Sequence, residues 1–89
     1  MRAIVTVIGT DRVGIIAGIS TVLADANVNI LDITQTTMQG IFTMIMLVNV
    51  KEASVSFEEL DKRLKAKGES LGLQVRIQRE DIFNSMHRI

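Results

Sequence analysis

The first part of the chain changes from one hydrophobic period to another. Residues 3–8 are mostly β-branched and end at Gly9, which is typical of a short strand followed by a turn. The apolar positions then recur with the period of an α-helix, and this spacing predicts a helix over residues 12–26 that ends near Asn27. The apolar stripe of this helix comprises Ile15, Ile16, Ile19, Val22, Leu23 and Ala26.

Two more apolar segments follow, over residues 28–38 and 41–50, and the pair Gln39-Gly40 separates them. This pattern predicts a β-hairpin with a tight turn. Ser56 and Glu59 have the spacing of a capping box, which predicts the start of a second helix. Its stripe is Phe57, Leu60, Leu64 and Leu71, and the alternation of apolar and polar residues from Leu73 to Gln78 predicts a last strand.

The resulting order of elements is β-α-β-β-α-β. Two right-handed β-α-β units joined by a hairpin predict an α+β fold of the ferredoxin-like type. We expect a four-stranded antiparallel sheet in the order 4-1-3-2, with both helices on one face. This domain covers residues 1–80. Residues 81–89 form a short C-terminal tail, predicted to be helical because Ile82, Phe83, Met86 and Ile89 have helical spacing, and expected to pack on the domain or on a partner subunit.

The two predicted central strands, residues 3–8 and 41–50, are apolar at both sets of alternating positions. A sheet with helices on one side usually has a polar opposite face. Soluble monomers rarely leave an apolar face of a few hundred Å² in water. We therefore expect the helix-free face to be covered by the tail, by a second subunit or by both, and we favour a homodimer.

Composition narrows the classes of function. Ten basic and ten acidic side chains balance, and the chain has only three Phe and no Tyr or Trp, which argues against nucleic-acid binding. No cysteine is present to form a disulfide framework or a thiolate metal site. No apolar run approaches the roughly 20 residues that span a bilayer, and no secretory signal is evident, so we expect a cytoplasmic protein without membrane contact.

Catalytic chemistry has little basis in the sequence. His87 is the only histidine, and none of the serines has a histidine partner at a spacing that would indicate a nucleophile. Three of the five methionines lie in the hairpin, where they are more typical of adaptable packing than of a metal site. We therefore expect no enzyme, no cofactor and no metal.

The connection between the first strand and the first helix is the one segment that suggests a binding site. Asp11 stands where a helix N-cap is expected, and the free N–H groups of a helix N-terminus attract anions. Gly14 has no Cβ, so a ligand carboxylate could approach the backbone there. We expect Asn29 to emerge beside this turn, so that these groups together could match a small zwitterion. In the structural alternative, Asp11 only caps the helix and Gly14 only permits close packing.

The segment GTDRVGII at residues 9–16, the sequence ANVNI at 26–30 and the order of elements resemble the ACT domain family of amino-acid-sensing modules. The resemblance covers about residues 2–80. The ending of the chain is similar to stand-alone bacterial and archaeal ACT proteins, and the first half resembles repressor-like ACT proteins of the glycine cleavage system. In this family, effectors bind at dimer interfaces, between the loop after the first strand and the second strand of the neighbouring subunit.

Transferred to this sequence, the resemblance implicates the loop residues Asp11, Arg12, Val13 and Gly14. From the second strand it implicates Asn29, together with Ile30 through its backbone. Many family members have a proline directly before the glycine, where this chain has Val13. The resemblance implies a regulatory homodimer that binds a small amino acid. The alternative is a module without a small ligand that docks on a protein partner and regulates it.

Overall fold

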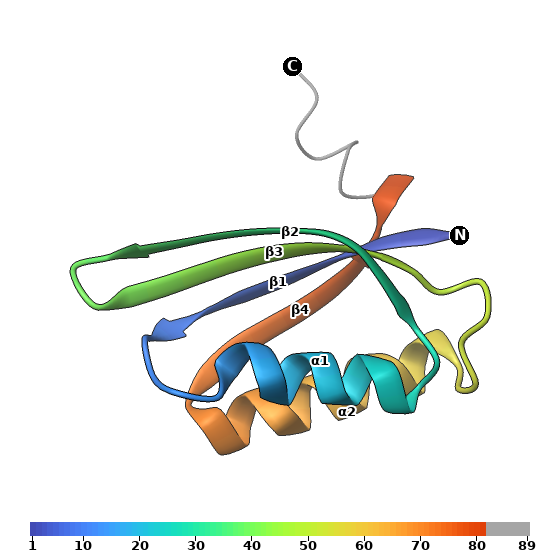
Figure 1. Cartoon of the computed structure of the whole chain (residues 1–89). Helices are drawn as coiled ribbons and strands as arrows, with labels where there is room; N and C mark the ends of the chain where they lie inside the picture. The colour runs from blue at the N-terminus through green and yellow to red at the C-terminus, as the bar shows by residue number, and fades with distance from the viewer. Residues whose placement is uncertain (82–89) are drawn as a thin grey trace.

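The computed structural model of the chain describes residues 1–81. Its elements follow the predicted order, and Figure 1 shows both helices on the same face of the sheet. Of the predicted helical tail at residues 81–89, residues 82–89 lie outside the described residues. The elements are β1 (Arg2–Thr10), α1 (Ile15–Asp25), β2 (Asn29–Met38), β3 (Ile41–Asn49), α2 (Phe57–Leu71) and β4 (Leu73–Arg79).

The sheet has the order β2-β3-β1-β4, which is the predicted order read from the other edge. All three pairings are antiparallel, so the ferredoxin-like α+β fold is confirmed. The central strands β1 and β3 pair from Arg2 opposite Asn49 to Thr10 opposite Ile41. Since β2 and β4 are the edges, their outer backbone groups have no strand partner among the described residues.

The core lies between the sheet and the helices. Alternate residues of β1, including Ala3, Val5 and Val7, are completely buried on the helix side. Fully burying a Val, Leu, Ile, Phe or Met side chain is worth about 1.5–3 kcal/mol relative to leaving it exposed, so this layer is a major source of stability in a chain without disulfides. From the other elements, the largest fully buried side chains are Ile19, Leu23, Met44, Met46, Val48, Leu60 and Leu64.

The hairpin between β2 and β3 is confirmed at the predicted turn. Gln39 and Gly40 both have positive φ, at 51° and 81°, which suits a two-residue turn whose twist matches the strands that it joins. The register of β2 shifts between Ile30 and Asp32, so Leu31 is an extra residue without a direct partner on β3.

The second helix begins as the sequence predicts. The Ser56 hydroxyl accepts a hydrogen bond from the Glu59 N–H at 3.1 Å. The reciprocal half of the capping box is replaced by an ion pair, because the Glu59 carboxylate lies 3.0 Å from Nε of Arg63 one turn later. One side-chain cap and two acidic residues in the first turn are enough to fix the helix start.

The predicted start of the first helix is wrong by three residues. The helix begins at Ile15 and not at residue 12, and its N-cap is Gly14 in the left-handed conformation. A residue with φ of 95° cannot continue an α-helix, so residues 11–14 form a turn before it. The predicted end is close, because Ala26 is the C-cap and Asn27 has a φ of 58°.

Candidate functional site

The loop between β1 and α1, residues 11–14, is attached to the hairpin turn at one end of the sheet. The Asp11 N–H donates to the Gly40 carbonyl at 2.9 Å. This bond fixes the backbone where the loop leaves β1, while all four residues of the loop remain exposed. The loop therefore presents its groups to solvent on a fixed base.

Asp11 is not the N-cap that the sequence predicts. The cap is Gly14, which has no side chain, and no side chain bonds to the N–H groups of the first turn of α1. No acidic residue lies in that first turn either. The positive end of the helix therefore has no acceptor among the described side chains, and it is chemically suited to an anionic group.

The packing explanation for Gly14 is also wrong. A Cβ built on Gly14 would meet no heavy atom within 4 Å, so this glycine is not needed for close contact with the sheet. Its positive φ is what requires it, because L side chains are strained in that conformation. The space beside Gly14 is open, which leaves room for another molecule next to the free N–H groups.

Arg12 and Val13 point to different surroundings. Nη1 of Arg12 donates to the Leu71 carbonyl at 3.4 Å, where the C-terminal end of α2 attracts a cation. This long bond connects the loop to the second helix. Val13 is 97% exposed and contributes no packing within the described part of the chain.

Asn29 and Ile30 do not lie beside the loop, so this expectation is wrong for a single chain. Asn29 lies opposite Asn49, which lies opposite Arg2, at the far end of the sheet. The loop follows Thr10, eight residues further along β1, which is about 26 Å away at the rise of a β-strand. Strands β1 and β2 are both antiparallel to β3, so the start of β2 must lie beside the start of β1 and not beside its end.

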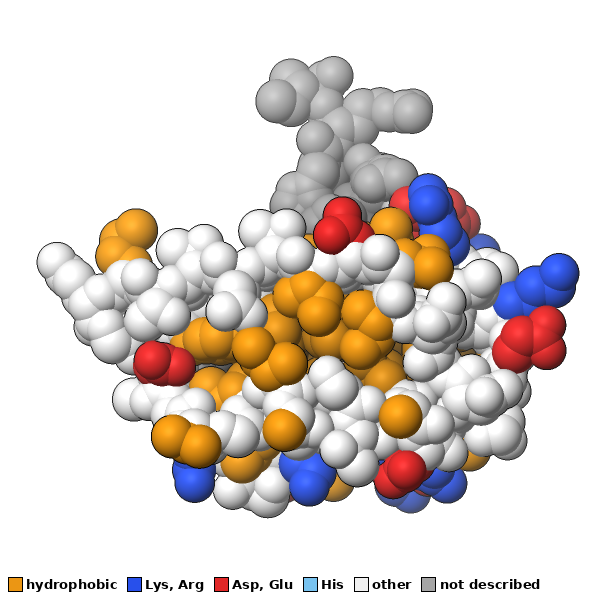
Figure 2. All heavy atoms as spheres, in the orientation of Figure 1, with side chains coloured by type: hydrophobic (Ala, Val, Ile, Leu, Met, Phe, Trp, Pro, Cys, Tyr) orange, Lys and Arg blue, Asp and Glu red, His pale blue; other side chains and the backbone are white. Residues whose placement is uncertain are grey.

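An apolar surface lies between α1 and the edge strand β2, and we call Ile16, Ile30 and Ile33 the α1–β2 flank. Ile33 lies opposite the core residue Met46, so it belongs to the helix side of the sheet, yet it remains exposed. Ile16 lies about 200° around α1 from Gly18, the residue that approaches α2. Figure 2 shows hydrophobic side chains gathered in the middle of this face of the molecule, between the strands and the helices.

Sequence reasoning placed Ile16 on the apolar stripe of the first helix and did not single out Ile33, so it missed this flank. Periodicity shows that apolar residues share one face of a helix or strand. It does not show how much of that face the neighbouring element covers. Few residues of α1 approach β2, so the edge strand is left uncovered on its helix side. A surface of this kind is typical of a contact with another molecule.

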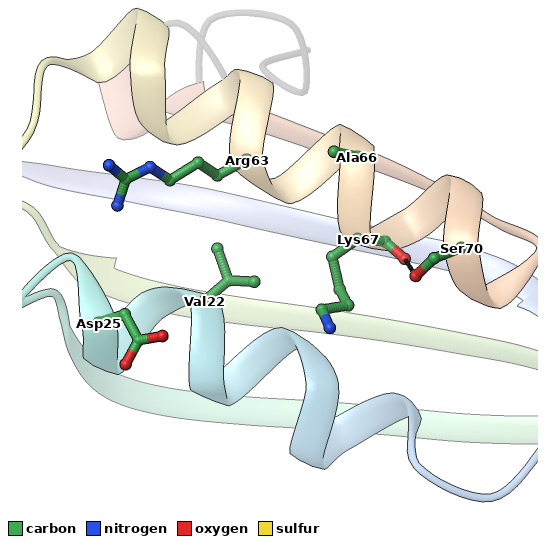
Figure 3. Close-up of a pocket in the computed structure, with 6 residues that line it drawn as sticks. All are labelled: Val22, Asp25, Arg63, Ala66, Lys67 and Ser70. Atoms are coloured by element: carbon green, nitrogen blue, oxygen red, sulfur yellow. Dashed lines mark hydrogen bonds between the residues drawn. The ribbon is translucent and has the colours of Figure 1, made fainter.

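A hollow with a volume of about 420 Å³ lies between the two helices. Figure 3 shows Lys67 extending from α2 toward α1 and Asp25 near the end of α1. None of the residues that we predicted to bind a ligand lines this groove. Its lining is Val22, Asp25, Arg63, Ala66, Lys67 and Ser70.

The described residues offer no arrangement that is typical of a catalytic or metal centre. Residues 1–81 contain no buried polar or charged side chain and no group of three His, Cys, Asp or Glu side chains that could hold a metal ion. Within the same part of the chain, no helix has both the length and the apolar character needed to cross a membrane.

With the fold and the loop described, comparisons with known proteins identify the family. The sequence profile described as "ACT domain" matches residues 2–78. The chain belongs to the ACT domain family. It is 59% identical over 88 residues to the UPF0237 protein of Methanocaldococcus jannaschii, covering 99% of this chain and 98% of that relative.

Solved structures agree with this assignment. An ACT domain protein from Streptococcus pneumoniae has a TM-score of 0.81 and 40% identity, over 93% of each chain. A putative glycine cleavage system transcriptional repressor has a TM-score of 0.77 over 88% of this chain and 44% of that protein. At 24% identity, that second likeness shows a shared fold. ACT domains are in general regulatory modules that bind ligands.

Proposed function

We propose that this ACT domain is a non-catalytic regulatory module of the cytoplasm that binds a small amino acid between two copies of the chain. The loop of one copy receives the carboxylate on the free N–H groups at the start of α1, beside Gly14. Asp11 pairs with the ammonium group. Asn29 and the Ile30 backbone of the other copy complete the site.

The separation of the two halves of the motif carries this proposal. About 26 Å of strand lies between the Asn29 end of the sheet and the loop, so one chain cannot close the site on a small molecule. A twofold axis makes two β2 strands antiparallel, which brings the start of one beside the end of the other. The Met38 end of β2 is the end nearest the loop, since Met38, Ile41 and Thr10 lie in one row.

The edge strand is suited to this pairing. It is ten residues long and exposed along nearly its whole length, and no proline or lysine within it discourages another strand. The apolar α1–β2 flank would be buried in the same contact. Pairing of this kind would both dimerise the chain and bring the loop to the partner's strand.

A thermal-shift screen of the twenty amino acids tests ligand binding. A ligand at 100 times its Kd stabilises the folded state by about 2.7 kcal/mol, which raises the Tm of a small domain by several degrees. We expect a small set of amino acids to give this shift. Asp11→Ala should remove the shift without lowering the Tm of the free protein, because the Asp11 contact with Gly40 is through its backbone.

A complementation experiment tests whether the site spans two copies. Asp11→Ala and Asn29→Ala proteins should each fail to bind. After co-refolding, half of the dimers are mixed and half of their sites are intact, so about a quarter of all sites should recover. No recovery would place both halves on one chain and contradict the proposal. If none of the twenty amino acids raised the Tm, the result would instead favour the alternative, a module without a small ligand that regulates a protein partner.

A further inference from the structure

The face of the sheet away from the helices carries an apolar stripe, which we call the open-face stripe. Its residues alternate with the buried residues of β1 and β3, so they point away from the helices. Ile4 lies opposite Leu47, Thr6 opposite Ile45, and Thr10 opposite Ile41. The stripe comprises Ile4, Ile8, Ile41, Ile45 and Leu47.

The stripe is least exposed at the end where the chain leaves β4. Ile4 is only 8% exposed although it does not belong to the core cluster beneath the helices. Ile45, one row further, is 39% exposed, and Ile41 at the far end is 56% exposed. An element that covers the stripe from the β4 exit would produce this order.

The exit of the chain from β4 is fixed beside this end of the stripe. Gln78 of β4 lies opposite Ile4. Two residues later, the Glu80 carboxylate receives both Nε and Nη2 of Arg2, at 2.9 Å and 2.7 Å. Arg2 is two residues before Ile4 in β1, so it has the same orientation and lies on the open side of the sheet. The two-bond ion pair therefore holds Glu80, the first residue after β4, on the open side of the sheet.

The eight residues that follow Asp81 have a sequence suited to this stripe. Ile82, Phe83, Met86 and Ile89 have the i, i+1, i+4, i+7 spacing of one helix face, and Asn84, Ser85, His87 and Arg88 fall on the other. A helix of eight residues is about 12 Å long. The part of the stripe between Ile4 and Ile8 spans four residues of strand, which is about 13 Å, whereas the whole stripe as far as Ile41, opposite Thr10, spans about 20 Å.

We propose that residues 82–89 dock in cis on the open-face stripe as a short amphipathic helix. The segment begins two residues after Glu80, near Ile4, and its length matches the part of the stripe from Ile4 to Ile8, which includes its least exposed end. Its apolar side chains can pack on the apolar side chains of the stripe. This docking leaves the α1–β2 flank and the β2 edge as the surface on which two copies meet. The inference goes beyond the proposed function, and its test needs no amino-acid ligand.

Phe83 provides a specific probe of this docking. The chain has three Phe and no Tyr or Trp; Phe42 is buried on the helix side of the sheet, and Phe57 begins α2. Phe83 is thus the phenyl ring available to the open face. In full-length protein labelled at Ile δ1 methyl groups, we expect ring-current shifts of the Ile4 and Ile45 signals. Phe83→Leu should remove these shifts, whereas the matched control Phe57→Leu should leave them unchanged.

Truncation and mixing separate the remaining outcomes. A chain that ends at Asp81 should lose the same shifts and bind a dye for exposed apolar surface more strongly than the full chain. Labelled truncated chains mixed with unlabelled full-length chains should show no recovery of the shifts, because docking in cis cannot be supplied by another copy. If the Ile4 and Ile45 methyl shifts were unchanged by both Phe83→Leu and truncation, the proposal would be overturned. If the shifts of truncated chains recovered on mixing, docking in cis would be overturned.

Discussion

Gly14 and Gly68 serve two different physical purposes at the residue scale. Gly14 has open space around it and a φ of 95°, so its backbone conformation requires a glycine. Gly68 lies in the last turn of α2 with an ordinary helical backbone, but a Cβ there would lie 2.6 Å from Cγ2 of Val75. From the sequence alone both are glycines near helix ends. Only the structure shows that Gly14 is required by its positive φ and Gly68 by its close contact with Val75.

Gly14→Ala should destabilise the domain by about 1–2 kcal/mol, since an L side chain is strained in the left-handed region. Urea unfolding followed by circular dichroism measures this loss. The matched control is Gly14→Asn, which should cost less because Asn tolerates this conformation better than Ala. Equal losses for the two variants would mean that backbone strain is not the cause.

Gly68→Ala should also destabilise the domain, by about 1–3 kcal/mol, because the new methyl group overpacks the contact between α2 and β4. Its control is the same substitution in a Val75→Ala background, which removes the nearest atom. In that background the free energy lost on Gly68→Ala should be smaller. An unchanged loss would point to the Leu73 carbonyl, 3.1 Å from the built Cβ, as the obstacle.

At the scale of elements, the two helices differ in how their starts are encoded. The start of α2 is set by a side chain, the Ser56 hydroxyl, which pattern recognition finds. The start of α1 is set by the left-handed Gly14, and Asp11 resembles a cap without acting as one. A single polar residue before an apolar stripe, such as Asp11, is therefore a weak indicator of a helix start. The pair Ser56 and Glu59 is a stronger one, because the spacing of three residues lets the Ser56 hydroxyl accept from the Glu59 N–H.

Ser56→Ala should lower the free energy of unfolding by about 1 kcal/mol, the usual cost of a lost N-cap. Chemical denaturation at neutral pH measures the difference. Ser54→Ala is a suitable control, because Ser54 contacts the Ala26 carbonyl through its backbone N–H. Ser56→Asp should restore most of the loss, since a carboxylate also accepts from the first turn.

At the scale of the whole molecule, two apolar surfaces are exposed to solvent, and we propose that each is buried by a different segment or molecule. The α1–β2 flank would meet a second copy, and the open-face stripe would meet residues 82–89. A single twofold contact closes on itself, whereas a second exposed apolar face would allow association to continue. If a second copy buries the flank and residues 82–89 bury the stripe, association would stop at the dimer.

If two copies pair as proposed, sedimentation at micromolar concentration should give about 19.6 kDa, twice the 9.8 kDa of one chain. Ile33→Glu should shift the protein toward the monomer, because the contact would bury a charge on the α1–β2 flank. Thr21→Glu is the matched control: Thr21 lies on the exposed side of α1, and its hydroxyl bonds only within the helix, to the Ala17 carbonyl. A dimer that tolerates Ile33→Glu would contradict the assigned interface.

The sequence by itself determined the order of elements, the hairpin turn at Gln39-Gly40, the order of strands and the family. These features depend on local periodicity, turn chemistry and the handedness of crossovers, all of which are encoded within short segments. The loop at residues 11–14 could also be found in this way, because its glycine and its position before a helix are local signals.

Only the tertiary structure decided how the candidate site is divided. Asn29 seemed close to Asp11 because one helix separates them in the sequence, but that helix returns the chain to the opposite end of the sheet. Likewise, Ile16 belongs to the apolar stripe of its helix and Ile33 lies on the helix side of the sheet, yet both are exposed because few residues of α1 approach the edge strand. Distances across a fold follow from packing between elements, which no local pattern contains.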